Sequence, residues 1–357
     1  MPIHKVGYRG WDGKKTPQWN RWWIITETGF RIAFQSTWVR RILLVCWLPV
    51  LYWGLGLFLI EQAVENRVFR PATLNVADVE SAGELVDEVA EEFRQEFSRE
   101  MIEEVIEELD MLPATDALAE AIRSNDENHI RHSIWSWLLM TFFRYPQGIA
   151  IVFLLGFVVP GLISQDVRSR AFLLYFSKPI GRIEYILGKM FIPIAFLLLI
   201  TTVPALFLCM FGVTLSPDLS VLKSTWDIPL RILAASLFVI IPVCSIAMML
   251  SSVTQESRFA TFAWFAVWAL GHAAWFAVVI TQAIRLNEEP FESIVQNDPV
   301  VARFSIVSLY NNLSNVQSWI FGFQPFQEVW PSAFALVAIT IISLMVLYRG
   351  VSAPVNV

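Results

Sequence analysis

The sequence predicts an all-α polytopic membrane protein with six transmembrane helices, an N-terminal amphipathic helix and a helical insert after the first span. Hydrophobic residues make up 55% of the chain and charged residues only 16%, against about 25% charged in soluble domains. Stretches without Asp, Glu, Lys or Arg are long enough for a helix of about 20 residues to cross a bilayer. They give predicted spans at 42–60, 145–165, 190–213, 232–253, 259–284 and 329–348.

Residues 1–41 precede the first predicted span and contain a candidate interfacial helix. Trp19, Trp23, Phe30 and Phe34 fall on one helical face, which is typical of a helix lying in the headgroup region. The helix either only anchors the chain or also has a further role. Because the first apolar run begins at 42, no cleavable signal peptide is predicted. The cysteines fall inside spans and are expected to be buried apolar residues: Cys46, Cys209 and Cys244.

Lysine and arginine mark the side of the membrane on which each loop lies. They concentrate in residues 1–41, in the 166–189 loop, in the turn at 256–258 and in the 349–357 tail. The positive-inside rule therefore predicts that both termini are cytoplasmic. The segment 61–144 and the loops near 214–231 and 285–328 are then extracytoplasmic.

The 61–144 insert is acidic, with 20 acidic and 7 basic residues and a balance of −13. Apolar residues recur every three or four positions and predict a long amphipathic helix over 82–112, which ends before Pro113. The stripe includes Val89, Phe93, Phe97, Met101 and Val105. A short helix at 115–124, a second copy or another protein is expected to cover it. Residues 130–143 are either interfacial or the first turns of the second span, which Arg144 and Pro146 interrupt.

His272 is the only ionisable residue in the centre of a predicted span, and Trp268 and Trp275 flank it. It is either a neutral histidine bonded to a neighbouring helix or part of a substrate path. The 285–328 loop mixes amides and aromatics, which suits an interfacial belt or a surface for a sugar or lipid headgroup. His129 and His132 have a spacing that two metal ligands could use. A solvated surface pair is the better interpretation, and we predict no metal site.

The sequence lacks a phosphate-binding loop of the Gly-x-x-x-x-Gly-Lys-Ser/Thr type. It also lacks a recognisable catalytic constellation. We therefore expect a non-enzymatic chain that binds no cofactor. No feature points to nucleic acid.

One polar, basic segment separates the second and third predicted spans. Its ordered pattern comprises Asp166, Ser169, Ser177, Pro179, Ile180, Arg182, Glu184, Tyr185, Gly188 and Lys189. This pattern resembles the loop after the second span in permease subunits of ABC transporters of the ABC-2 class. The N-terminal helix resembles the elbow helix of the same permeases.

The resemblance implies an exporter permease in a bacterial plasma (inner) membrane, which works as a homodimer with two ATPase subunits. The residues implied to couple it to the ATPase are Asp166, Arg168, Arg170, Ser177, Pro179, Arg182, Glu184 and Lys189. Positive-inside anchoring is an alternative role for the basic members, but it does not account for Asp166 and Glu184. A second hypothesis is a mechanotransmitting subunit that moves no solute and passes ATPase-driven motion to an extracytoplasmic protein through the insert.

Overall fold

The computed structural model describes residues 20–65, 127–171, 180–216, 221–286 and 298–351, together with Ala121 and Val295. Within these ranges all the regular elements are helices. Six of them are long and apolar enough to cross a bilayer: Thr37–Leu59, Asn128–Arg168, Arg182–Leu215, Ile228–Val253, Ser257–Arg285 and Phe326–Gly350. The predicted all-α polytopic fold with six candidate membrane spans is confirmed. The insert helix at 82–112 and its stripe lie outside the described residues.

The first half of the chain forms α1 (Arg21–Gln35), α2 (Thr37–Glu65), α6 (Glu127–Phe142), the π-helical turn η2 (Phe143–Gln147), α7 (Gly148–Val158), α8 (Pro160–Arg168), α10 (Arg182–Ile200) and α11 (Thr202–Leu215). The second half forms α12 (Val221–Ser224), α13 (Ile228–Val253), α14 (Ser257–Leu286), α16 (Pro299–Phe304), the 3₁₀ turn η3 (Ser305–Val307), α17 (Leu309–Phe321) and α18 (Phe326–Gly350).

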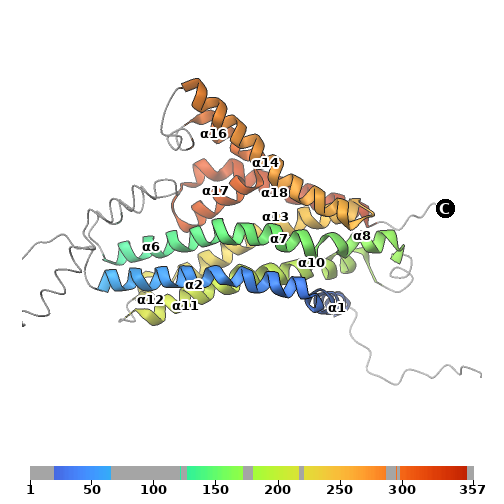
Figure 1. The fold of residues 1–357 in the computed structure, drawn as a ribbon, viewed down its shortest axis with the longest axis horizontal. Helices are drawn as coiled ribbons and strands as arrows, with labels where there is room; N and C mark the ends of the chain where they lie inside the picture. Colours follow the sequence, from blue (N-terminus) through green and yellow to red (C-terminus); the bar gives the residue numbers. More distant parts are fainter. Residues whose placement is uncertain are drawn as a thin grey trace, which may run out of the picture.

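The long helices form a bundle around α13, and α14 leaves it obliquely toward α16 (Figure 1). The most apolar part of α13 is 67% buried, whereas that of α14 is only 17% buried. The core around α13 contains Leu154, Phe196, Leu197, Val243 and Met248, all fully buried. A single chain therefore leaves most of the apolar surface of α14 uncovered.

The second span begins earlier than the 145–165 prediction. One helical run extends over Asn128–Arg168, so residues 130–143 are its first turns, and Trp135, Leu139 and Phe142 are buried. Pro146 lacks an N–H, and its ring clashes with a regular helix. The wider turn η2 carries this proline, and such turns are single-turn insertions into α-helices. The interruption seen in the sequence is therefore a local widening of one helix.

The third span also begins earlier than predicted, at Arg182 and not at 190. The backbone N–H of Gly181 donates to Glu184 Oε2 at 2.9 Å. This bond is one of the two that make up a capping box. It satisfies a backbone N–H group that the start of a helix leaves without a partner. Residues 182–189 of the predicted loop are thus the first turns of α10.

The segment predicted as the 285–328 outer loop contains α16, η3 and α17. The Ser308 hydroxyl accepts from the backbone N–H of Asn311 at the start of α17, and Gly322, with φ of 92°, ends it. The left-handed conformation favours glycine. Helix α17 packs on α13, α14 and α18. It buries amide side chains that the sequence alone places in a loop, including Asn311, Asn312 and Gln317.

Polar networks join the helices at the end of the bundle that holds the start of α6 and α12. Glu61 pairs with Arg131 at 3.3 Å and accepts from Trp135 Nε1 at 2.8 Å. Asp227 accepts from Arg231 Nε at 2.6 Å, and His132 Nε2 lies 3.1 Å from it. Burial raises the pKa of Asp227, but the Arg231 and His132 contacts outweigh it and lower the pKa. His132 thus contacts the residue that precedes α13 and is partly exposed, while His129 is exposed, as predicted.

Candidate functional site

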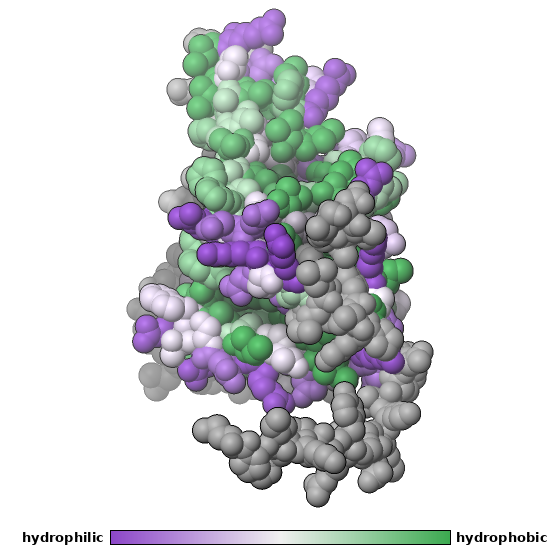
Figure 2. All heavy atoms as spheres, turned by 90° about the vertical axis from the view of Figure 1, so that its right-hand side faces the viewer, coloured by the Kyte–Doolittle hydropathy of each residue, from purple (hydrophilic) through white to green (hydrophobic). Residues whose placement is uncertain are grey.

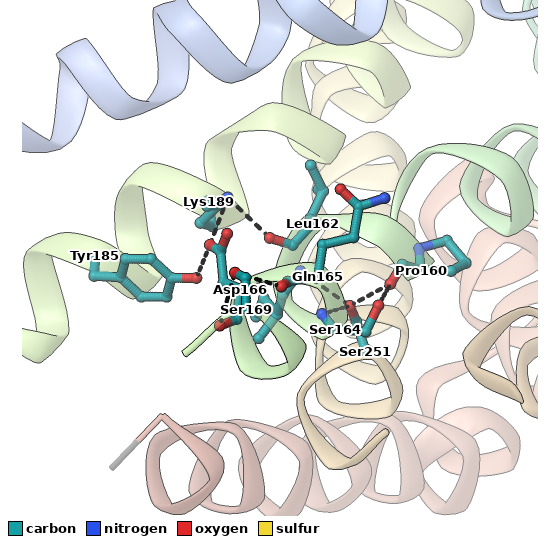
Figure 3. A network of polar contacts seen from close by, with 10 residues as sticks. Pro160, Leu162, Ser164, Gln165, Asp166, Ser169, Tyr185, Lys189 and Ser251 are labelled. Atoms are coloured by element: carbon teal, nitrogen blue, oxygen red, sulfur yellow. Dashed lines mark hydrogen bonds and ion pairs between the residues drawn. The ribbon is translucent and has the colours of Figure 1, made fainter. Parts of the chain in front are cut away.

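The polar segment that carries the sequence pattern lies at the opposite end of the bundle. We call this the basic end; it comprises α1, the end of α8 and the turn between α13 and α14. Figure 2 shows this end, with hydrophilic residues gathered across the middle of the face and apolar residues above them. Here α8, α10 and α13 meet in a network of polar contacts (Figure 3).

An ion pair joins α8 to α10. Lys189 Nζ lies 2.9 Å from Asp166 Oδ2, and the Tyr185 hydroxyl donates to the same oxygen at 2.6 Å. Lys189 also donates to the carbonyl of Leu162 at 2.9 Å. The Lys189 and Asp166 side chains are only 14% and 15% exposed, so the pair is screened less than a surface salt bridge. It fixes the position of the α8 end relative to α10.

A serine joins the same part of α8 to α13. Ser251 Oγ donates to the carbonyl of Pro160 at 2.9 Å and accepts from the backbone N–H groups of Ile163 and Ser164, each at 3.2 Å. The residue is fully buried, where unpaired polar groups are costly. The start of α8 is therefore held firmly to α13 (Figure 3).

Helix α1 packs directly on α10 next to this network. Thr26 Oγ1 donates to the carbonyl of Gly188 at 2.9 Å, and the Phe30 and Phe196 rings stack at 4.5 Å. A Cβ on Gly188 would lie 2.8 Å from the carbonyl oxygen of Trp22. Only glycine therefore allows α1 to approach α10 this closely. The contact is at Gly188, the residue that precedes Lys189 in the chain.

The predicted coupling residues divide into internal and exposed groups. Asp166 and Lys189 bond each other, and Glu184 caps α10. Arg168 and Arg170 are exposed at the end of α8, with Arg168 3.7 Å from Glu256 and 70% exposed. Arg182 occupies the first position of α10. Ser177 and Pro179 lie outside the described residues.

The predicted substrate-path residues all lie on α14, and His272 contacts α17. The His272 ring lies 5.4 Å from that of Trp275 and 5.5 Å from that of Tyr310. His272 itself is exposed. Trp268, one turn earlier, lines a small cavity of about 20 Å³ together with Arg144 and Tyr310.

Arg144 is a candidate site residue that the sequence prediction does not include, because the predicted 145–165 span begins after it. It lies inside the helical run, with its guanidinium carbon 5.9 Å from the ring centres of both Tyr145 and Tyr310. An arginine inside a span is itself a signal of function. The long aromatic run before it was the sequence signal that the helix continues.

A family comparison covers nearly the whole molecule. The family model described as ABC-2 family transporter protein matches residues 26–351, from within α1 to the end of α18. A search of the curated proteins gave no match. The match includes all six candidate membrane helices and the network at the basic end. The chain therefore belongs to the ABC-2 family of transporter proteins and is a multi-pass integral membrane protein.

Proposed function

We propose that this permease subunit belongs to an exporter and converts ATP hydrolysis by a separate ATPase into repacking of its helices. The observation that carries the proposal is the Asp166–Tyr185–Lys189 network. It ties the two ends of the 166–189 segment to each other, while Ser251 and Thr26 connect them to α13 and α1. A force applied to this segment would thus reach four helices.

In this mechanism the arginines at the end of α8 and the start of α10 contact the ATPase, and the largely buried pair transmits its motion. Arg168, Arg170 and Arg182 offer donors for acidic groups of the partner. Closure of the ATPase dimer around ATP would move α8 and α10 as one unit, because Asp166 and Lys189 hold them together. A cavity of about 670 Å³ lies beside α1, lined by Phe30, Phe34 and Phe191 among others. ATP binding shifts the equilibrium only by binding one state more tightly.

The assembly that we propose is a homodimer with two ATPase subunits in a bacterial inner membrane, both termini being cytoplasmic. The basic end would face the cytoplasm, as the positive-inside rule predicts. The largely uncovered α14 supplies a face for the second copy. ATP and Mg²⁺ would be bound by the ATPase and not by this chain. The hypothesis of an extracytoplasmic partner on the insert stays a prediction from the sequence.

The proposal is tested by purifying the tagged chain in mild detergent and labelling single cysteines in intact cells. We expect a subunit with a phosphate-binding loop to co-purify. We expect Ser169→Cys to resist a membrane-impermeant maleimide and Arg303→Cys, on α16, to react. Recovery of the chain without any ATPase, or labelling of Ser169→Cys in sealed cells, would contradict the proposal.

A further inference from the structure

Arg144 carries a charge within the second membrane helix, where a guanidinium is costly and is retained for a function. Its contacts in the described chain are the faces of two tyrosine rings, which attract a cation but accept no strong hydrogen bond. Its Nε atom is buried and has no hydrogen-bond partner among the described residues. The described residues therefore supply no acceptor for the Nε–H group of Arg144.

Two more unpartnered donors lie around the same cavity. Ser314 Oγ on α17 and Trp268 Nε1 on α14 are buried without a partner in the described part of the chain. Ser314 is only 2% exposed, so water does not reach it freely. Arg144, Trp268 and Ser314 all line the cavity of about 20 Å³. Three separate elements, η2, α14 and α17, therefore each contribute to the lining of one small space a residue that has an unsatisfied donor.

The chemistry of this lining selects an acceptor. Arginine Nε and tryptophan Nε1 can only donate, and a serine hydroxyl can donate as well as accept. No acidic side chain belongs to the lining within the described residues. Buried unsatisfied donors cost free energy, so an anionic oxygen that accepts from them would be strongly favoured. The π-helical turn η2, which positions Arg144, is of a kind that often marks functional sites.

The size and surroundings of the cavity narrow the ligand further. A space of about 20 Å³ holds little more than one water-sized atom, so it fits one oxygen of a larger group. Helix α14 carries exposed apolar side chains within about 100° of Trp268 around the helix: Val267 is 37% exposed and Phe276 is 44% exposed. A ligand that places an oxygen in the cavity would therefore have its remaining atoms against the apolar surface of α14, on the helix that the proposed second copy would also face.

We propose that this cavity receives one oxygen of the phosphate or carboxylate headgroup of an amphiphilic substrate whose apolar chain lies along α14. The inference rests on the proposed transport function and adds the substrate class to it. Arg144 supplies the charge, and Trp268 and Ser314 orient one anionic oxygen. Exposed His272 lies beside Tyr310, which also lines the cavity.

The test is equilibrium binding of radiolabelled monododecyl phosphate to the purified chain in nanodiscs of phosphatidylcholine. We expect saturable binding at one site per chain, with competition by dodecanoate. Dodecyl maltoside, which has the same chain but no charge, should not compete. Inorganic phosphate should not compete either, because it lacks the apolar part.

Conservative substitutions of the cavity residues test whether the ligand binds in the cavity. Arg144→Gln should weaken binding by about tenfold or more, because it removes a charge-assisted bond. Trp268→Phe and Ser314→Ala, which change shape little, should each weaken it by about threefold to tenfold. The matched controls are Arg303→Gln and Trp330→Phe, at exposed positions on α16 and α18, and they should bind like the parent.

Non-saturable partition, or an unchanged affinity in Arg144→Gln and Trp268→Phe, would overturn the proposal and leave the cavity as a water site. Equally strong binding of inorganic phosphate would overturn the amphiphile assignment. Binding needs no ATPase. A failure here therefore leaves the co-purification result intact, and loss of ATPase co-purification with binding preserved would refute the proposed function alone.

Discussion

Glu61→Leu is expected to lower the free energy of unfolding by about 3–5 kcal/mol. Glu61 is 2% exposed and pairs with the Arg131 guanidinium, which is 11% exposed. Removing the carboxylate leaves a buried cation without its counter-charge and takes the acceptor from Trp135 Nε1. The measurement is thermal unfolding of the purified chain in detergent.

Removing both charges separates the effect of the orphaned charge from that of lost packing. The double variant Glu61→Leu/Arg131→Met should recover much of the loss, because the remaining buried charge is gone. Glu328→Leu, at an exposed position in the first turn of α18, should change the melting temperature little. If Glu61→Leu melts like the parent, the buried pair does not hold α2 to α6.

Arg182→Glu is expected to abolish ATPase stimulation while leaving the chain folded. Arg182 is the first residue of α10, where an acidic side chain suits the helix dipole. Glu184 remains to cap the helix. A charge reversal at a protein contact removes an attraction and adds a repulsion worth several kcal/mol, so ATPase affinity should fall by about 100-fold or more.

The readouts are the amount of ATPase that co-purifies and the hydrolysis rate of the complex. Arg303→Glu, on α16 at a distance along the chain from the 166–189 segment, serves as the charge-matched control and should retain both. An Arg182→Glu variant that keeps its ATPase and full stimulation would show that this arginine makes no coupling contact.

The six spans could be predicted because the length of each uncharged apolar run can be counted in the sequence. The starts of the second and third spans could be predicted less accurately. Arg144 and Pro146 look like a break, since a π-helical turn has no sequence period of its own. The early start of α10 did have a signal, because Gly181 and Glu184 have the spacing of a capping box.

The candidate sites depend on contacts between segments that are distant in sequence. Asp166 and Lys189 could be chosen as site residues, but their bond to each other follows only from the packing of α8 on α10. Helix α17 is rich in Asn, Gln and Ser and looks like a loop. Its burial depends on α13, α14 and α18, which surround it. The cavity of Arg144, Trp268 and Ser314 needs all three of its elements in place.

Site-specific photo-cross-linking in native membranes tests most directly whether the 166–189 segment contacts an ATPase. A benzoylphenylalanine residue would replace Arg168 at the end of α8, Arg182 at the start of α10 or, as a control, Arg303 on α16. We predict that the first two positions cross-link to an ATPase subunit and that the control does not. Cross-linking of the ATPase at Arg303, or none at Arg168 and Arg182 in a complex that still contains the ATPase, would contradict the assignment of this segment as the coupling element.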